Sequence, residues 1–170
     1  HEFYGLFAMQ QYEQSIGIAN KMIASATRKE LGDFRYSKYN YLLANALFKQ
    51  KRFQEASQLL SQERALTKDK AGWETGARVL TIMTFIEMQK LNEASLAIES
   101  LRKFIEYTHK TTPVSLRDKT ILSLLIGAER KGFMFSLLNG KTERLLAVIN
   151  SSYEKNQWEP FTHELIPFHE

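Results

Sequence analysis

One spacing pattern occurs three times in the chain, and it constrains the fold more than any other feature. In each copy a large apolar residue is followed six positions later by a second large apolar residue, and three positions after that by a small one. The copies start at Leu6, Leu47 and Phe85. The second large residues stand at positions 12, 53 and 91, so the repeat is 41 and then 38 residues long. Such a pattern is typical of a tight turn between two antiparallel helices, repeated along the chain as stacked hairpins.

The composition suits a helical protein. The 170 residues include only eight glycines and three prolines, and the first proline is Pro113. With 44% apolar and 25% charged residues, the chain is neither disordered nor membrane-spanning by composition. The absence of cysteine excludes disulfides, cysteine-ligated zinc and a cysteine nucleophile. We therefore predict an all-α fold of about four antiparallel helical hairpins.

The repeated unit resembles the tetratricopeptide repeat. That family prefers a small residue at the eighth position of its unit, an aromatic residue at the seventeenth and alanine at the twentieth. In the second unit of this chain these positions hold Ala44, Phe53 and Ala56, and the third unit keeps Leu91 and Ala94. The resemblance implies a right-handed stack of hairpins, a TPR-like α-solenoid.

The chain also departs from the family pattern. The glycine usual in the tight turn is replaced by Gln10, Lys51 and Gln89. The units are longer than the family's roughly 34 residues, so the segments between units must be longer.

We predict a single helical-repeat domain over residues 1–170. Its units are about 1–32, 33–69, 70–111 and 112–156, with a C-terminal capping helix in 157–170. In the fourth unit Phe133 and Ser136 take the aromatic and small positions, and Asn139-Gly140 interrupts the second helix. Because the chain begins with a histidine and within a helical unit, we expect it to be part of a longer polypeptide.

Caps and helix-breaking residues predict the individual helices. We place Asp33 at one helix N-cap, and Ser115, with Asp118 three residues later, at another. The predicted helices cover about 2–9, 12–30, 34–50, 53–66, 71–89, 91–109, 114–131 and 142–153.

The sequence offers no catalytic motif. It has no Gly-x-Gly pair and no Gly-x-Ser-x-Gly sequence, so we expect neither a phosphate loop nor a nucleophile elbow. His163 and His169 are six positions apart, which would put them on opposite sides of a helix rather than on one metal ion. We predict that the protein is not an enzyme and has no metal and no cofactor.

The net charge of +4 comes mainly from residues 21–70, which carry +6. Acidic side chains are interleaved with the basic ones there, which favours a solvated helix surface over a phosphate-binding patch. We therefore expect no nucleic-acid and no membrane partner, and a cytoplasmic location. Binding of RNA or DNA through this region is the alternative, and steep salt dependence would reveal it.

The resemblance implies that the first helix of each hairpin lines a concave groove for a partner. Carried over position by position, the partner-binding residues are Phe7, Lys38, Tyr41, Asn45, Phe48, Lys49, Val79, Met83, Ile86, Glu87, Ile121 and Leu125. Asn45 stands where some family members clamp a peptide carboxylate, but the third unit supplies no basic residue there. The clamp is therefore not expected.

The apolar members of this set have three possible explanations. They form ordinary core, or they hold a segment of a partner protein, or they are covered by other parts of the same polypeptide or by a second copy. We predict a non-catalytic protein–protein interaction module that binds a peptide or helix in the groove. The alternative is a regulatory or sensor domain of a larger signalling or transcription-regulating protein.

Overall fold

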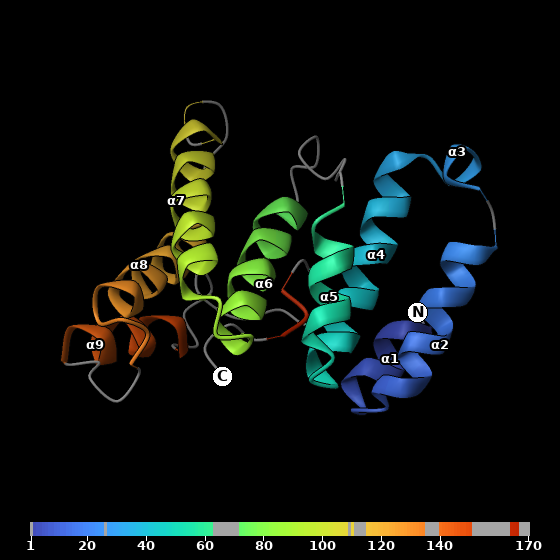
Figure 1. The fold of residues 1–170 in the computed structure, drawn as a ribbon, viewed down its shortest axis with the longest axis horizontal. Helices are drawn as coiled ribbons and strands as arrows, with labels where there is room; N and C mark the ends of the chain where they lie inside the picture. The colour runs from blue at the N-terminus through green and yellow to red at the C-terminus, as the bar shows by residue number, and fades with distance from the viewer. Residues whose placement is uncertain are drawn as a thin grey trace.

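The computed structural model describes residues 2–25, 27–62, 72–108, 110, 115–134, 140–150 and 164–166, and of Lys141 the backbone alone. In these ranges the chain forms nine α-helices and no strand. The helices are α1 (Glu2–Ala8), α2 (Tyr12–Ala24), α3 (Arg28–Leu31), α4 (Asp33–Lys49), α5 (Phe53–Leu60), α6 (Trp73–Glu87), α7 (Leu91–Thr108), α8 (Leu116–Arg130) and α9 (Gly140–Asn150) (Figure 1).

The helices pack antiparallel in the order of the sequence. Each long helix contacts the next one along the chain, from α1 on α2 to α8 on α9, and α4 also contacts α6 directly. Figure 1 shows the resulting row of helices, with α1–α4 at one end and α8–α9 at the other. The predicted all-α fold of paired helices is confirmed.

The three sequence copies make the same turn. Gln10, Lys51 and Gln89 have φ angles of 60°, 59° and 57°, in the left-handed region. In the first turn the Gln10 N–H donates to the Phe7 carbonyl and the next N–H donates to the Leu6 carbonyl. The other two turns repeat both bonds, at 2.9 Å each. This is the Schellman motif, and each of these side chains occupies a conformation that glycine adopts at lower cost.

The spacing pattern is explained by packing around these turns. The rings of Phe7 and Tyr12 lie 5.3 Å apart, and those of Phe48 and Phe53 lie 5.2 Å apart, both edge to face. The small residues of the pattern are completely buried, as close approach of two helices requires. They are Ser15, Ala56 and Ala94.

The fourth turn differs in register from the prediction. The Gly132 N–H donates to the Glu129 carbonyl and the Phe133 N–H to the Ala128 carbonyl, both at 2.8 Å, so Gly132 is the counterpart of Gln10. Phe133 therefore lies within the turn, with φ 59°, and does not begin a helix as Tyr12 does. The assignment of Phe133 to the aromatic position was wrong by one residue, while Ser136 lies outside the described residues.

Other helix boundaries also differ from the predictions: the helix predicted over 53–66 ends at Leu60. The helix predicted over 12–30 ends at Ala24, and a separate short helix follows. Thr27 caps that helix: its N–H donates to Glu30 Oε2 at 2.7 Å, and its hydroxyl accepts from the Glu30 N–H. The Thr27 N–H and the Thr27 hydroxyl both donate to the Glu30 carboxylate, and these two hydrogen bonds lower the pKa of Glu30. A local capping box therefore prevents one continuous helix.

At the next boundary Asp33 is the first residue of α4, and Gly32 is its N-cap, with φ 76°. The prediction of Asp33 as the cap was therefore wrong. Ser115 is confirmed as the cap of α8, because its hydroxyl accepts from the Asp118 N–H at 3.0 Å.

The buried side chains form two clusters that meet on α6. The first takes residues from α1, α2, α4, α5 and the start of α6, and also Leu165 and Ile166. The second takes Val79 and Ile82 of α6 with residues of α7, α8 and α9. One helix thus contributes to both halves of the core.

The predicted capping helix is not seen in the part of it that the structure describes. Glu164, Leu165 and Ile166 are not helical, and all three are buried. The rest of 157–170 lies outside the described residues, as does the linker 63–71. In the described ranges no helix combines the length and apolar character needed to span a membrane.

Candidate functional site

The twelve predicted partner-binding residues do not form one exposed stripe. Phe7, Tyr41, Asn45, Val79 and Ile121 are buried; Lys38, Phe48, Lys49, Met83, Ile86 and Leu125 are half-buried; Glu87 is exposed. The four buried apolar side chains belong to the two core clusters. For these residues the structure fits the core explanation, and their role toward a partner stays a prediction.

An aromatic and cationic group joins α4 to α6. The rings of Tyr41 and Trp73 lie 5.9 Å apart and nearly perpendicular. The Lys38 ammonium lies 4.1 Å from the centre of the Trp73 ring, within the range of a cation–π interaction. Both α4 and α6 are first helices of predicted hairpins. Two predicted partner-binding residues of α4, Lys38 and Tyr41, therefore contact the same residue of α6, Trp73.

Tyr41 is fully buried, and its phenol is kept neutral. Burial raises the pKa of Tyr41, and the negative charge of Glu164 raises it further, while a hydrogen bond from the Asn45 side chain acts in the opposite direction. Glu164 is followed by Leu165 and Ile166, which belong to the same buried cluster as Tyr41 of α4.

Arg117, in the first turn of α8, holds the Glu164 carboxylate in a bidentate ion pair. Its Nε donates to Glu164 Oε2 at 2.5 Å, and its second terminal nitrogen donates to Oε1 at 2.6 Å. The remaining terminal nitrogen donates to the carbonyl of Ile149 on α9 at 3.0 Å. The Arg117 and Glu164 side chains are only 9% and 3% exposed. Guanidinium and carboxylate thus meet fork to fork in a buried site.

The two residues after Glu164 lie in the first of the two core clusters. Leu165 and Ile166 are 6% and 3% exposed and belong to the cluster that contains Tyr41 and Trp73. We call Glu164–Ile166 the tail segment, and Arg117 together with the cluster around Tyr41 and Trp73 the tail site. The tail segment therefore connects α8 to the first core cluster, and its red trace lies between α5 and α6 in Figure 1.

Asn45 adds a buried acceptor on α4. Its Nδ2 donates to the Tyr41 carbonyl at 2.8 Å. Its Oδ1 is buried and finds no hydrogen-bond partner within the described part of the chain. A ligand N–H that reached this oxygen would satisfy it, since a buried unpaired acceptor is costly.

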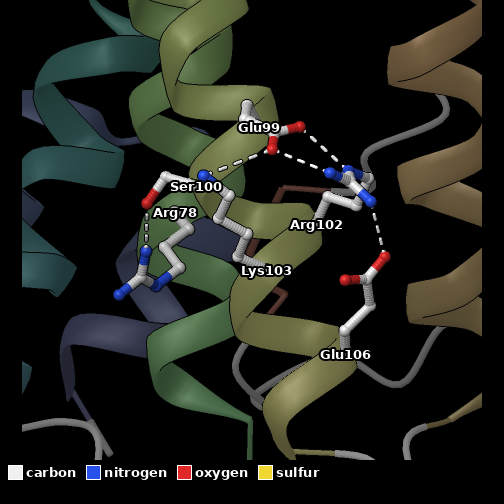
Figure 2. A network of polar contacts seen from close by, with 6 residues as sticks. All are labelled: Arg78, Glu99, Ser100, Arg102, Lys103 and Glu106. Atoms are coloured by element: carbon white, nitrogen blue, oxygen red, sulfur yellow. Dashed lines mark hydrogen bonds and ion pairs between the residues drawn. The ribbon is translucent and has the colours of Figure 1, made fainter.

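The outer side of the α6–α7 hairpin is a charged surface of another kind. Figure 2 shows Arg102 between Glu99 and Glu106, with Lys103 also near Glu99, and Arg78 donating to Ser100. The hydrogen bonds from Arg102, with the nearby Lys103, lower the pKa of Glu99 to about 2. The pairs within α7 are helix-surface pairs at spacings of three and four residues, which stabilise a helix and need no ligand.

The structure shows no metal site in the ranges that it describes: nowhere do three His, Cys, Asp or Glu side chains come together. All four histidines fall outside the described residues; they are His1, His109, His163 and His169.

Sequence reasoning missed Arg117, Trp73 and the tail segment. Asp118, the neighbour of Arg117, was predicted at the cap of α8, and there the Asp118 N–H donates to Ser115. The partner of Arg117 lies 47 residues further along the chain, so no local pattern connects the two. An arginine in the first turn of a helix, where a carboxylate is the favoured charge, is the local signal that could have drawn attention to Arg117.

Comparison with known proteins adds no relative: no protein-family model, no curated protein and no solved structure matches this chain.

Proposed function

We propose that this chain is a non-catalytic protein–protein interaction module of the TPR-like helical-repeat type. It binds a peptide segment along a face built by the first helices of successive hairpins, α4, α6 and α8. Aromatic and aliphatic side chains give affinity, and Lys38 and Arg117 give selectivity for acidic groups.

One observation carries the proposal: a short non-helical segment from a distant part of the chain is buried against these helices. Glu164 pairs with Arg117 of α8, and Leu165 and Ile166 join the cluster that holds Tyr41 of α4 and Trp73 of α6. The arrangement is that of a bound peptide, with hydrophobic anchors and one charge-assisted contact. The repeated Schellman turns at Gln10, Lys51 and Gln89 support the assignment to a helical-repeat protein.

Panning of a random peptide display library against the purified chain tests this function. We expect enriched peptides that slow amide exchange in 38–48 of α4 and 79–86 of α6. The matched variants are Lys38→Glu, which should weaken binding, and Lys103→Glu on the exposed side of α7, which should not. Failure of any peptide to be enriched, or protection confined to other helices, would contradict the proposal.

A further inference from the structure

We propose that the tail segment is the resident ligand of this module, and that the tail site recognises a peptide with an acidic residue followed directly by two aliphatic residues. The chain's own Glu164-Leu165-Ile166 occupies the site until a partner segment of the same chemistry displaces it. This inference rests on the proposed function and names its ligand and its regulation.

The acidic position is specified by Arg117. A guanidinium that donates two parallel hydrogen bonds selects a planar carboxylate, and neither an amide nor an ammonium can accept both. The third contact of Arg117, to the Ile149 carbonyl, is made with α9 and is independent of the tail segment. The fork is therefore already oriented when a ligand arrives, which reduces the entropy lost on binding.

The two aliphatic positions are specified by burial. Leu165 and Ile166 are consecutive, and both are nearly inaccessible to solvent. The segment is not helical, so the residues that contact the site are consecutive in the sequence rather than spaced three or four apart. The recognised motif is therefore short and contiguous, as in many linear peptide motifs.

The packing of the helices indicates that the tail segment can leave without unfolding the stack. Each long helix contacts its neighbour in sequence, from α1 on α2 to α8 on α9, and residues 164–166 belong to none of these helices. The tail segment is thus an addition to a continuous row of helices.

A tethered ligand competes strongly with a free one. An intramolecular segment acts at an effective concentration of about 1 mM or more. The apparent affinity of a partner peptide is therefore its intrinsic affinity multiplied by the fraction of chains whose site is open. The tail segment therefore sets the affinity or concentration that a partner peptide needs in order to displace it.

A binding experiment on the full chain tests the inference. The probe is a fluorescein-labelled synthetic peptide of residues 158–170. The open variant carries Glu164→Gln, Leu165→Ser and Ile166→Ser together. We expect the open variant to bind the probe about tenfold more tightly than the unmodified chain or better, because its own tail no longer competes. A probe carrying Glu164→Gln should bind the open variant about tenfold more weakly than the original probe.

Variants of the protein test whether Arg117 contacts the glutamate of the probe. In the open variant, Arg117→Leu should abolish the preference for the original probe over the Glu164→Gln probe, whereas Arg130→Leu, at the exposed end of the same helix, should leave it intact. Equal binding of the two probes by the open variant would overturn the assignment of Arg117.

A second measurement covers the case in which the open variant does not fold. In the unmodified chain, amide exchange of Leu165 and Ile166 should be about a hundredfold faster than that of the buried residues of α4, because the tail segment opens locally. Exchange of both regions at one common rate would show that the tail segment is inseparable from the core and would overturn the inference.

The two proposals fail differently. If the open variant binds library-selected peptides but not the probe, the proposed function stands and this inference falls. If it binds neither, both fall.

Discussion

The guanidinium of Arg117 and the carboxylate of Glu164 face each other across 47 residues of sequence, with two nitrogen–oxygen distances of 2.5 and 2.6 Å. Both side chains are almost fully buried. A buried ion pair contributes little net free energy, but it selects its partner strictly, because an unpaired buried charge is costly. The first prediction follows from this pair.

Glu164→Gln should lower the free energy of unfolding by about 3 kcal/mol, because it leaves the Arg117 charge buried without its counter-ion. The double variant Arg117→Met with Glu164→Leu should recover most of that loss, since no buried charge remains. Urea unfolding measures both. The control is Asp33→Asn, which breaks the exposed pair of Arg28 and Asp33 and should cost less than about 1 kcal/mol. Similar losses for the buried and the exposed pair would contradict this account.

Lys51→Gly should stabilise the protein by about 0.5 to 1 kcal/mol. Lys51 has φ 59°, and relief of a left-handed conformation outweighs the larger backbone entropy of glycine in the unfolded chain. The neighbouring Gln50→Gly is the matched control, because Gln50 has φ −84° and should lose stability by a similar amount. If both substitutions destabilise equally in thermal unfolding, the left-handed turn carries no strain.

Tyr41 should make the fold sensitive to alkali. Burial raises the pKa of Tyr41 above that of an unfolded tyrosine, near 10. A group whose pKa is raised on folding contributes stability that is complete below the unfolded pKa and is lost as the pH rises toward the folded pKa. Above pH 10 this group alone should therefore remove about 1.4 kcal/mol per pH unit.

Chemical denaturation at a series of alkaline pH values measures this slope. Tyr41→Phe should make the decline shallower, whereas Tyr107→Phe, at a residue that is 72% exposed, should not. An unchanged slope in Tyr41→Phe would mean that Tyr41 ionises freely in the folded state.

Glu99 should titrate far below an ordinary glutamate. Hydrogen bonds from Arg102 lower its pKa to about 2, with a smaller contribution from Lys103. In an NMR titration of the side-chain carboxyl, Arg102→Met should return the pKa of Glu99 toward its ordinary value, and Lys103→Met should move it less. Because the pKa of Glu99 is lowered on folding, its contribution to stability is present above the ordinary pKa and is lost as the pH falls toward 2. A Glu99 pKa that stays near 2 in Arg102→Met would contradict the ion pair in Figure 2.

The sequence by itself determined the helical class, the positions of the first three hairpin turns and the residues around them. These features are local. A left-handed residue at 10, 51 or 89, an apolar residue two positions later and a small one three positions beyond it interact within one hairpin, so their spacing appears directly in the sequence. The cap at Ser115 is local in the same way.

Other local features were predicted wrongly because two local signals competed. The capping box of Thr27 and Glu30 outweighed helical periodicity between Ala24 and Arg28. At the fourth turn Gly132 took the left-handed position and shifted Phe133 by one residue.

Only the tertiary structure decided which apolar residues are core and where the tail segment lies. Rotation of a helix about its own axis changes neither its periodicity nor its composition, so the sequence could not separate the buried Tyr41 and Val79 from the half-buried Met83 and Ile86. The pairing of Arg117 with Glu164 joins two residues 47 positions apart, and it depends on how the tertiary structure places them. Local spacing carries no record of that placement, and so the tail site became visible only in three dimensions.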